Sequence, residues 1–131
     1  MNEEALDLWR RSLRSLKTAE GLVDEDPDAA ASRAYYAAFY AVSALFAIQG
    51  ETFGKHSALK AALHRDLVKP GKVAPETGAA FSWLADLRST GDYGGSLHVD
   101  VPQARDAVRK AHVVLDAMRQ LSPEPFPEAG K

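Results

Sequence analysis

Residues 28–49 restrict the possible folds of this chain more than any other segment, because apolar side chains surround nearly the whole of a predicted helix. One apolar stripe at helical spacing consists of Tyr35, Phe39, Val42 and Phe46. A second stripe consists of alanines, at positions 30, 34, 37, 41 and 44. Small side chains at this spacing let another helix approach closely. A helix with so few polar faces must be buried on most sides, by its own chain or by a second copy of it.

Helical spacing of apolar residues recurs in the rest of the chain, and no segment alternates with period two for long enough to make a convincing strand. Asp26 and Asp100 stand where N-caps are expected, and Pro27 suits the first position of a helix. We expect helices over residues 2–23, 28–49, 57–68, 75–88 and 101–121. Residues 1–121 therefore predict one all-α domain, an up-and-down bundle of about five helices. Residues 122–131 contain three prolines and are expected to form a flexible tail.

The composition limits the environment and the partners of the protein. The chain has 131 residues and no cysteine, which excludes disulfides and thiolate metal sites and favours a reducing cytoplasm. Its net charge of −2 argues against coating of nucleic acid by bulk electrostatics, although a local basic patch is compatible with it. The first residues lack the pattern of a signal peptide, and the longest apolar run, 34–48, is shorter than the roughly 20 residues of a bilayer span. We therefore expect a soluble cytoplasmic protein with no membrane partner.

Residues 87–95 are the first candidate for a functional site. Arg88 stands at the end of the fourth predicted helix and is followed by a glycine-rich loop that carries Asp92 and Tyr93. A guanidinium held at a helix end can bind two phosphate oxygens at once. Asp92 would orient that guanidinium, and Tyr93 can donate or accept a hydrogen bond. The alternative interpretation is structural: Arg88 caps the helix and pairs with Asp92, while Tyr93 covers the end of the bundle.

Lys55 and His56 form a second candidate site, immediately before the third predicted helix. The free backbone N–H groups and the dipole of a helix favour anions at its N-terminus, so both side chains could bind phosphate. The structural alternative is exposure to solvent, with His56 or Ser57 as the cap. His98 lies in the loop after Arg88 and could turn toward it.

The sequence does not support other chemistry. No pair of histidines, or of glutamate and histidine, has the spacing of a zinc or di-iron site, so we expect no metal and no cofactor. The chain lacks the nucleotide-binding phosphate loop, the dinucleotide-binding glycine pattern and the nucleophile elbow. Tyr35, Tyr36, Phe39 and Tyr40 could stack on bases, but their place in so apolar a helix favours the core or a dimer interface.

Three segments, in this order, resemble the small stand-alone HEPN proteins of bacteria and archaea. They are residues 32–41 (Ser-Arg-Ala-Tyr-Tyr-Ala-Ala-Phe-Tyr-Ala), 54–57 (Gly-Lys-His-Ser) and 87–94, from Leu-Arg to Asp-Tyr-Gly. The resemblance covers roughly residues 3–121. It implies a helical bundle that pairs into a homodimer, and we expect the small-residue and aromatic faces of the second helix and its neighbours to form the interface. It also implies a small nucleotidyltransferase encoded alongside, the two proteins acting as toxin and antitoxin.

Active HEPN proteins are metal-independent ribonucleases that place an arginine, four to six residues and then a histidine near the dimer interface. Arg88 matches the arginine of that motif, but Tyr93 and the two glycines after it occupy the histidine positions. Metal-free cleavage needs a base for the 2′-hydroxyl proton, an acid for the leaving oxygen and positive charge on the phosphate. A tyrosine with its ordinary pKa near 10 is a sluggish base. The resemblance therefore leaves proton transfer to His56 or His98, from the same or the partner chain.

These observations predict an RNA- or nucleotide-phosphate-binding protein, the toxin-like member of a toxin–antitoxin pair. If it is a ribonuclease, Arg88 and His56 are the expected catalytic residues. The expected phosphate ligands are Lys55, Arg88, Asp92 and Tyr93. Tyr93 also resembles, by its position, the tyrosine to which the nucleotidyltransferase attaches AMP in some related pairs. The alternative is a non-catalytic HEPN module that binds a nucleotide or holds the nucleotidyltransferase.

Overall fold

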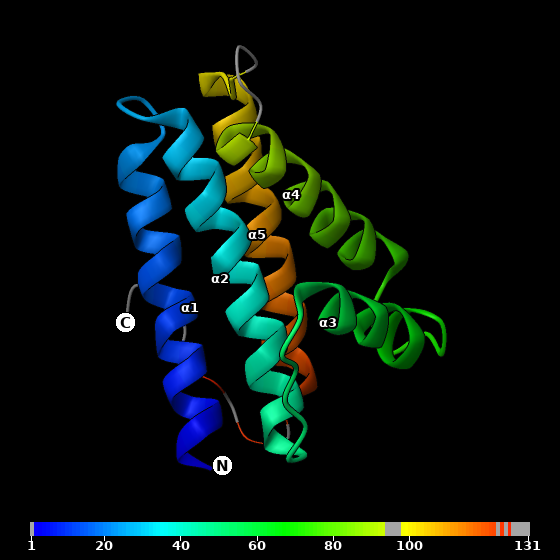
Figure 1. Ribbon diagram of the computed structural model, residues 1–131. Coiled ribbons are helices and arrows are strands. Elements are labelled where there is room, and N and C mark those ends of the chain that lie inside the picture. The colour runs from blue at the N-terminus through cyan, green and yellow to red at the C-terminus, as the bar shows by residue number, and fades with distance from the viewer. Residues whose placement is uncertain (1, 94–97, 123, 125, 127–131) are drawn as a thin grey trace.

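The computed structural model describes residues 2–93, 98–122, 124 and 126 and, at residues 91–93, the backbone alone. These residues form five α-helices (Figure 1). Their bounds are α1 Glu3–Leu22, α2 Pro27–Ile48, α3 His56–Leu63, α4 Pro75–Tyr93 and α5 Val101–Leu121, and a π-helical segment, η1 His64–Val68, continues α3. The predicted all-α bundle of five helices is confirmed.

The starts of three helices follow from polar side chains that satisfy free backbone N–H groups. Asn2 accepts from the N–H of Ala5 at the start of α1, at 2.7 Å. Asp26 caps α2, with Pro27 at the first helical position as predicted. Asp100 caps α5 and forms a capping box with Gln103, whose side chain accepts from the backbone N–H of Asp100. Local side-chain chemistry therefore fixes where these helices begin.

α2 is the central helix, and α1, α4 and α5 pack against it. In Figure 1, α1, α2 and α5 run alongside one another, and α4 crosses them at an angle. All five alanines of the predicted stripe are fully buried, and the buried hydroxyl of Ser12 in α1 donates to the carbonyl of Ala37 at 2.6 Å. The prediction that the small-residue face of α2 serves a homodimer is therefore wrong, because helices of the same chain already cover that face.

The third helix differs from the prediction in where it begins and in how it ends. It starts at His56, with Lys55 at the N-cap position, so Ser57 lies inside the helix. Three leucines at helical spacing in this segment, Leu59, Leu63 and Leu67, are buried. The last turns widen into the π-helical η1.

η1 lies close to the start of α4 at Gly78. A Cβ atom at Gly78 would lie 2.8 Å from Cε1 of His64 and 2.9 Å from Cγ2 of Val68. The ring of His64 also reaches α4, where its Nε2 lies 3.3 Å from Oγ of Ser82. An added side chain at position 78 would therefore force His64 or Val68 to shift, and this close approach favours glycine.

α4 is longer than predicted. It continues to Tyr93, whereas the sequence pattern placed its end near Arg88 and a loop from residue 91 onward. A glycine inside a helix costs about 1 kcal/mol, which is too little to end a helix by itself. Gly91, Asp92 and Tyr93 therefore belong to the last turn of α4 and not to a loop. Trp83 of the same helix is half-buried.

Residues 122–131 were predicted to be a flexible tail, and most of them lie outside the described residues. One residue that is described, Phe126, is buried and stacks on Trp9 of α1, with ring centres 4.4 Å apart and an interplanar angle of 8°. The segment after α5 thus returns to α1 and covers part of its core face.

Candidate functional site

Arg88 is held by two consecutive tyrosines of α2. Its guanidinium donates to the hydroxyl of Tyr36 at 3.1 Å. The guanidinium carbon lies 5.3 Å from the centre of the Tyr36 ring and 5.6 Å from the centre of the Tyr35 ring. A cation over an aromatic face is attracted by the charge distribution of the ring, and more strongly where water is partly excluded. The half-buried Arg88 is thereby fixed in position against α2.

His56 contacts the same tyrosine pair from the start of α3. Its Nδ1 lies 3.0 Å from the hydroxyl of Tyr35, and the centre of its ring lies 4.3 Å from that of Phe39. Burial, and after it the positive charge of Arg88, lower the pKa of His56 below its usual 6.5. Burial raises the pKa of Tyr35 to about 12. Near pH 7 the imidazole is therefore neutral and the phenol protonated.

These contacts join residues from three helices into one group. We call Arg88, Tyr36, Tyr35 and His56 the Arg–Tyr–His cluster. α2 supplies its centre, because the ring centres of both Tyr35 and Tyr36 lie within 5.7 Å of the centre of the His56 ring of α3 and of the guanidinium carbon of Arg88 of α4. Arg88 and His56 are 32 positions apart in the sequence and meet through this tyrosine pair.

The other predicted ligands have different positions. Lys55 is exposed at the N-cap of α3, next to His56, and makes no side-chain capping hydrogen bond. Asp92 and Tyr93 lie in the last turn of α4, four and five residues after Arg88, and their side chains lie outside the described residues. Residues four apart share one face of a helix, so the backbone places Asp92 on the face of Arg88.

His98 contacts the start of α2. Its Nδ1 lies 3.0 Å from the carboxylate of Asp28, which also accepts from the backbone N–H of Val99 at 2.7 Å. The hydrogen bond from Val99 and the interaction with His98 lower the pKa of Asp28. The contact ties the segment before α5 to the N-terminus of α2. His98 is therefore paired with Asp28, whereas His56 belongs to the Arg–Tyr–His cluster.

Sequence reasoning missed the two tyrosine hydroxyls. Tyr35 and Tyr36 were assigned to the core or a dimer interface because of their helical spacing. Tyr35 is indeed buried, yet its hydroxyl bonds to His56, and Tyr36 is half-buried and bonds to Arg88. The signal in the sequence was the presence of two adjacent tyrosines in an apolar helix, because a buried tyrosine hydroxyl usually needs a polar partner.

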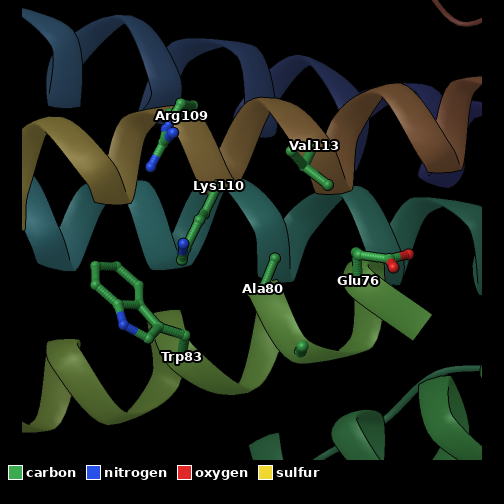
Figure 2. Close-up of a pocket in the computed structure, with 7 residues that line it drawn as sticks. Glu76, Ala80, Trp83, Arg109, Lys110 and Val113 are labelled. Atoms are coloured by element: carbon green, nitrogen blue, oxygen red, sulfur yellow. The ribbon is translucent and has the colours of Figure 1, made fainter. Parts of the chain in front are cut away.

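A separate hollow of about 460 Å³ lies between α4 and α5 (Figure 2). Trp83 of α4 faces Lys110 of α5, whose Nζ lies 4.8 Å from the centre of the indole ring. Val113, which is 41% exposed, lines the same hollow. Arg109 at its edge forms an ion pair with Asp106. This hollow shares α4 with the Arg–Tyr–His cluster, but none of the residues that line it belongs to the cluster.

The described residues contain no group of three or more His, Cys, Asp or Glu side chains that could hold a metal ion. In the same part of the chain, no helix combines the length and the apolar character needed to cross a membrane.

The fold and the cluster define a small all-α domain with a basic and aromatic site between α2, α3 and α4. The HEPN domain family matches residues 5–121. A UPF0332 protein of Thermotoga maritima is 40% identical over 121 residues, covering 91% of this chain and 92% of that protein. The chain therefore belongs to the HEPN family.

Two more distant relatives share most of the domain. The Methanocaldococcus jannaschii protein named "Putative toxin MJ0142" is 25% identical over 86% of this chain and 78% of its own length. A UPF0332 protein of Gloeobacter violaceus is 33% identical over 73% of this chain and 77% of its own length.

Proposed function

We propose that this HEPN protein is the toxin-like member of a toxin–antitoxin pair and binds the phosphates of RNA or of a nucleotide at the Arg–Tyr–His cluster. The observation that carries the proposal is the contact of Arg88 and His56 with the same tyrosine pair. One side chain brings a permanent positive charge and the other a neutral imidazole near pH 7. The relative named as a toxin supports the same class of function.

In its enzymatic form the proposal is metal-independent RNA cleavage. The 2′-oxygen attacks the adjacent phosphorus while the bond to the 5′-oxygen breaks, giving a 2′,3′-cyclic phosphate and a 5′-hydroxyl. Arg88 neutralises the charge that develops on the phosphoryl oxygens. His56 takes the 2′-hydroxyl proton, and the leaving 5′-oxygen receives a proton from the imidazolium or from water. Lys55, exposed beside His56, contacts a neighbouring phosphate.

Tyr35 positions the imidazole for this transfer. A phenol hydroxyl both donates and accepts, so Tyr35 can bond to Nδ1 of His56 whether or not that nitrogen carries a proton. When Nδ1–H donates to Tyr35, Nε2 has a free lone pair and can accept the 2′-hydroxyl proton. Tyr36 holds Arg88 in the same way, by accepting from its guanidinium.

The test is RNA cleavage by the purified protein in EDTA. We expect the wild type to cleave the RNA. The rate of cleavage should fall about 100-fold or more in Arg88→Ala, because a hydrogen-bond donor to the developing charge is removed. We expect a similar fall in His56→Ala, because a general base contributes about 100-fold or more. The matched control is His98→Ala, which removes the histidine paired with Asp28 and should cut like the wild type. Folding of each variant is checked by thermal melting, and a fully active Arg88→Ala protein would overturn the proposal.

A non-catalytic module is the second candidate, and one observation favours it. Position 93 holds tyrosine where active HEPN motifs hold histidine. In this case the protein binds RNA or nucleotide through Arg88 without turnover, or only holds the nucleotidyltransferase. Binding that is lost in Arg88→Ala, with no cleavage by the wild type, would establish it.

The proposal extends to partners and regulation. We expect a cytoplasmic homodimer that works with a small nucleotidyltransferase, with Tyr93 as the residue that receives AMP and Asp92 as a further ligand near Arg88. Co-expression with the nucleotidyltransferase and peptide mass spectrometry test this role. The expected result is an AMP adduct on the peptide that contains Tyr93 and none in Tyr93→Phe. An unmodified wild-type peptide would rule the role out.

A further inference from the structure

A basic pocket of about 390 Å³ lies between α1 and α2, beside the Arg–Tyr–His cluster. Its lining consists of Arg11, Arg14, Ser15, Thr18, Arg33 and Tyr40. Among the described residues, those that line it include no acid. Arg11 has a partner of its own, the exposed Asp7 one turn earlier in α1, at 3.2 Å. Three guanidinium groups, two hydroxyls and a phenol thus surround one hollow, all able to donate hydrogen bonds.

Such a gathering of like charge needs an explanation, because the chain as a whole carries a net charge of −2. Guanidinium groups of two helices repel one another when no anion lies between them. The fork of donors on arginine matches the oxygens of a phosphate. The pocket therefore has the chemistry of a phosphate site.

Tyr36 connects this pocket to the cluster. The guanidinium carbon of Arg33 lies 4.9 Å from the centre of the Tyr36 ring, and that of Arg88 lies 5.3 Å from the same centre. Tyr40, one turn further along α2, has its ring centre 6.0 Å from that of Tyr36 and lines the pocket. The guanidinium groups of the two arginines and the half-buried rings of the two tyrosines thus form one continuous strip.

We propose that the α1–α2 pocket binds a second backbone phosphate of a single-stranded RNA whose first phosphate lies against Arg88. This inference rests on the proposed function and assigns it a substrate class, because a nucleoside monophosphate carries a single phosphate and cannot supply one to each site. Between the two phosphates, the half-buried ring of Tyr40 lines the pocket and offers surface on which a base stacks, as in other proteins that bind single strands. Arg14 and Arg33 are the proposed contacts to the second phosphate.

The test measures binding of a fluorescent single-stranded RNA of about ten nucleotides. Its 2′-O-methyl groups remove the attacking hydroxyl, so cleavage does not interfere. We expect Arg14→Gln to weaken binding about tenfold and to reduce the slope of log K against log salt by about 0.7, because one phosphate contact on a single strand is lost. Arg14→Lys should restore most of the binding, since it keeps the charge. Lys69→Gln, an exposed charge on the segment after η1, should bind like the wild type.

The outcomes separate this inference from the function on which it rests. AMP binding should be unchanged in Arg14→Gln and weakened in Arg88→Gln. If Arg14→Gln binds the RNA like the wild type while Arg88→Gln does not, the second site is wrong and the proposed function stands. If the wild type binds neither RNA nor AMP, the proposed function is wrong, and the second site with it.

Discussion

At the scale of single residues, the surroundings of His56 determine whether its imidazole is neutral or charged. The ring packs on Phe39 and lies near the guanidinium of Arg88, and both surroundings disfavour the imidazolium. Most exposed histidines change charge close to neutrality, whereas His56 stays neutral to lower pH. A neutral imidazole beside a fixed cation can accept a proton and then readily lose it. At pH 7 the neutral imidazole is therefore available as a base, and the imidazolium that forms when it takes a proton gives that proton up readily.

The first prediction concerns the titration of His56 itself. NMR titration of its ring protons should give a pKa below 6.5, and Arg88→Gln should raise that pKa, because the neighbouring positive charge is removed while burial remains. The control is Arg10→Gln, an exposed arginine of α1, which should leave the pKa unchanged. A His56 pKa that does not move in Arg88→Gln would contradict the electrostatic coupling.

The same shift makes stability depend on pH in a defined window. The folded pKa of His56 lies below the unfolded value near 6.5, so the unfolded chain takes up the proton first. The free energy of unfolding should be insensitive to this group above about pH 6.5 and should fall as the pH drops through the folded pKa. Asp28, whose pKa is also lowered, acts in a separate window below its usual 3.8. Urea unfolding of wild type and His56→Gln at several pH values isolates the contribution of the histidine.

At the scale of elements, the approach of α4 to η1 depends on the missing side chain of Gly78. In an open helix, alanine stabilises relative to glycine by about 0.5–1 kcal/mol. At Gly78, however, a methyl group would lie within 3 Å of both His64 and Val68. Val68 is β-branched and cannot rotate away easily. Packing should therefore outweigh helix propensity.

We predict that Gly78→Ala lowers the free energy of unfolding by about 1–3 kcal/mol, the usual cost of overpacking. The matched control is Gly21→Ala in α1, where no atom lies within 4 Å of the added methyl. That variant should gain about 0.5–1 kcal/mol, because only propensity acts there. Urea denaturation of the two variants gives the comparison. Equal effects at both positions would mean that the contact between η1 and α4 is not tight.

How well the sequence predicts the bounds and contacts of each helix depends on how far apart in the chain the interacting residues lie. Caps at Asp26 and Asp100 depend on neighbours within three residues, and both were predicted correctly. The end of α4 was placed near Arg88 because a glycine-rich segment follows, but glycines are a weak local signal and the helix continues to Tyr93. The alanine stripe of α2 predicted a close helix contact but not whether the covering helix belongs to the same chain.

At the scale of the whole molecule, the site depends on how helices distant in sequence are placed. Periodicity shows which residues share a face, but it does not show which helix that face meets. Arg88 reaches Tyr36 across 52 positions because α4 crosses α2 at an angle, as Figure 1 shows. The candidates Arg88 and His56 were therefore recognisable from residue chemistry and from the resemblance, whereas their tyrosine partners required the tertiary structure.

The segment after α5 is the other feature that only the tertiary structure shows. Phe126 covers Trp9, and both side chains are almost fully buried. Residues 122–131 were expected to form a flexible tail, yet a buried aromatic pair is worth several kcal/mol through its area and its stacking. Phe126 thus covers the core at Trp9 of α1.

We therefore predict that Phe126→Ala destabilises the protein by about 3 kcal/mol, the lower end for a buried phenylalanine because the chain end can adjust. A chain ending at residue 121 should lose about as much, since Phe126 is the buried residue of the tail that the structure describes. Urea unfolding measures both variants, and Glu124→Ala, an exposed residue of the same segment, is the control. The emission of Trp9 should shift to longer wavelength in Phe126→Ala as water reaches its ring, and a Trp9→Phe background identifies the contribution of Trp83. If truncation and Phe126→Ala both leave stability unchanged, the tail does not hold the core and the domain ends with α5.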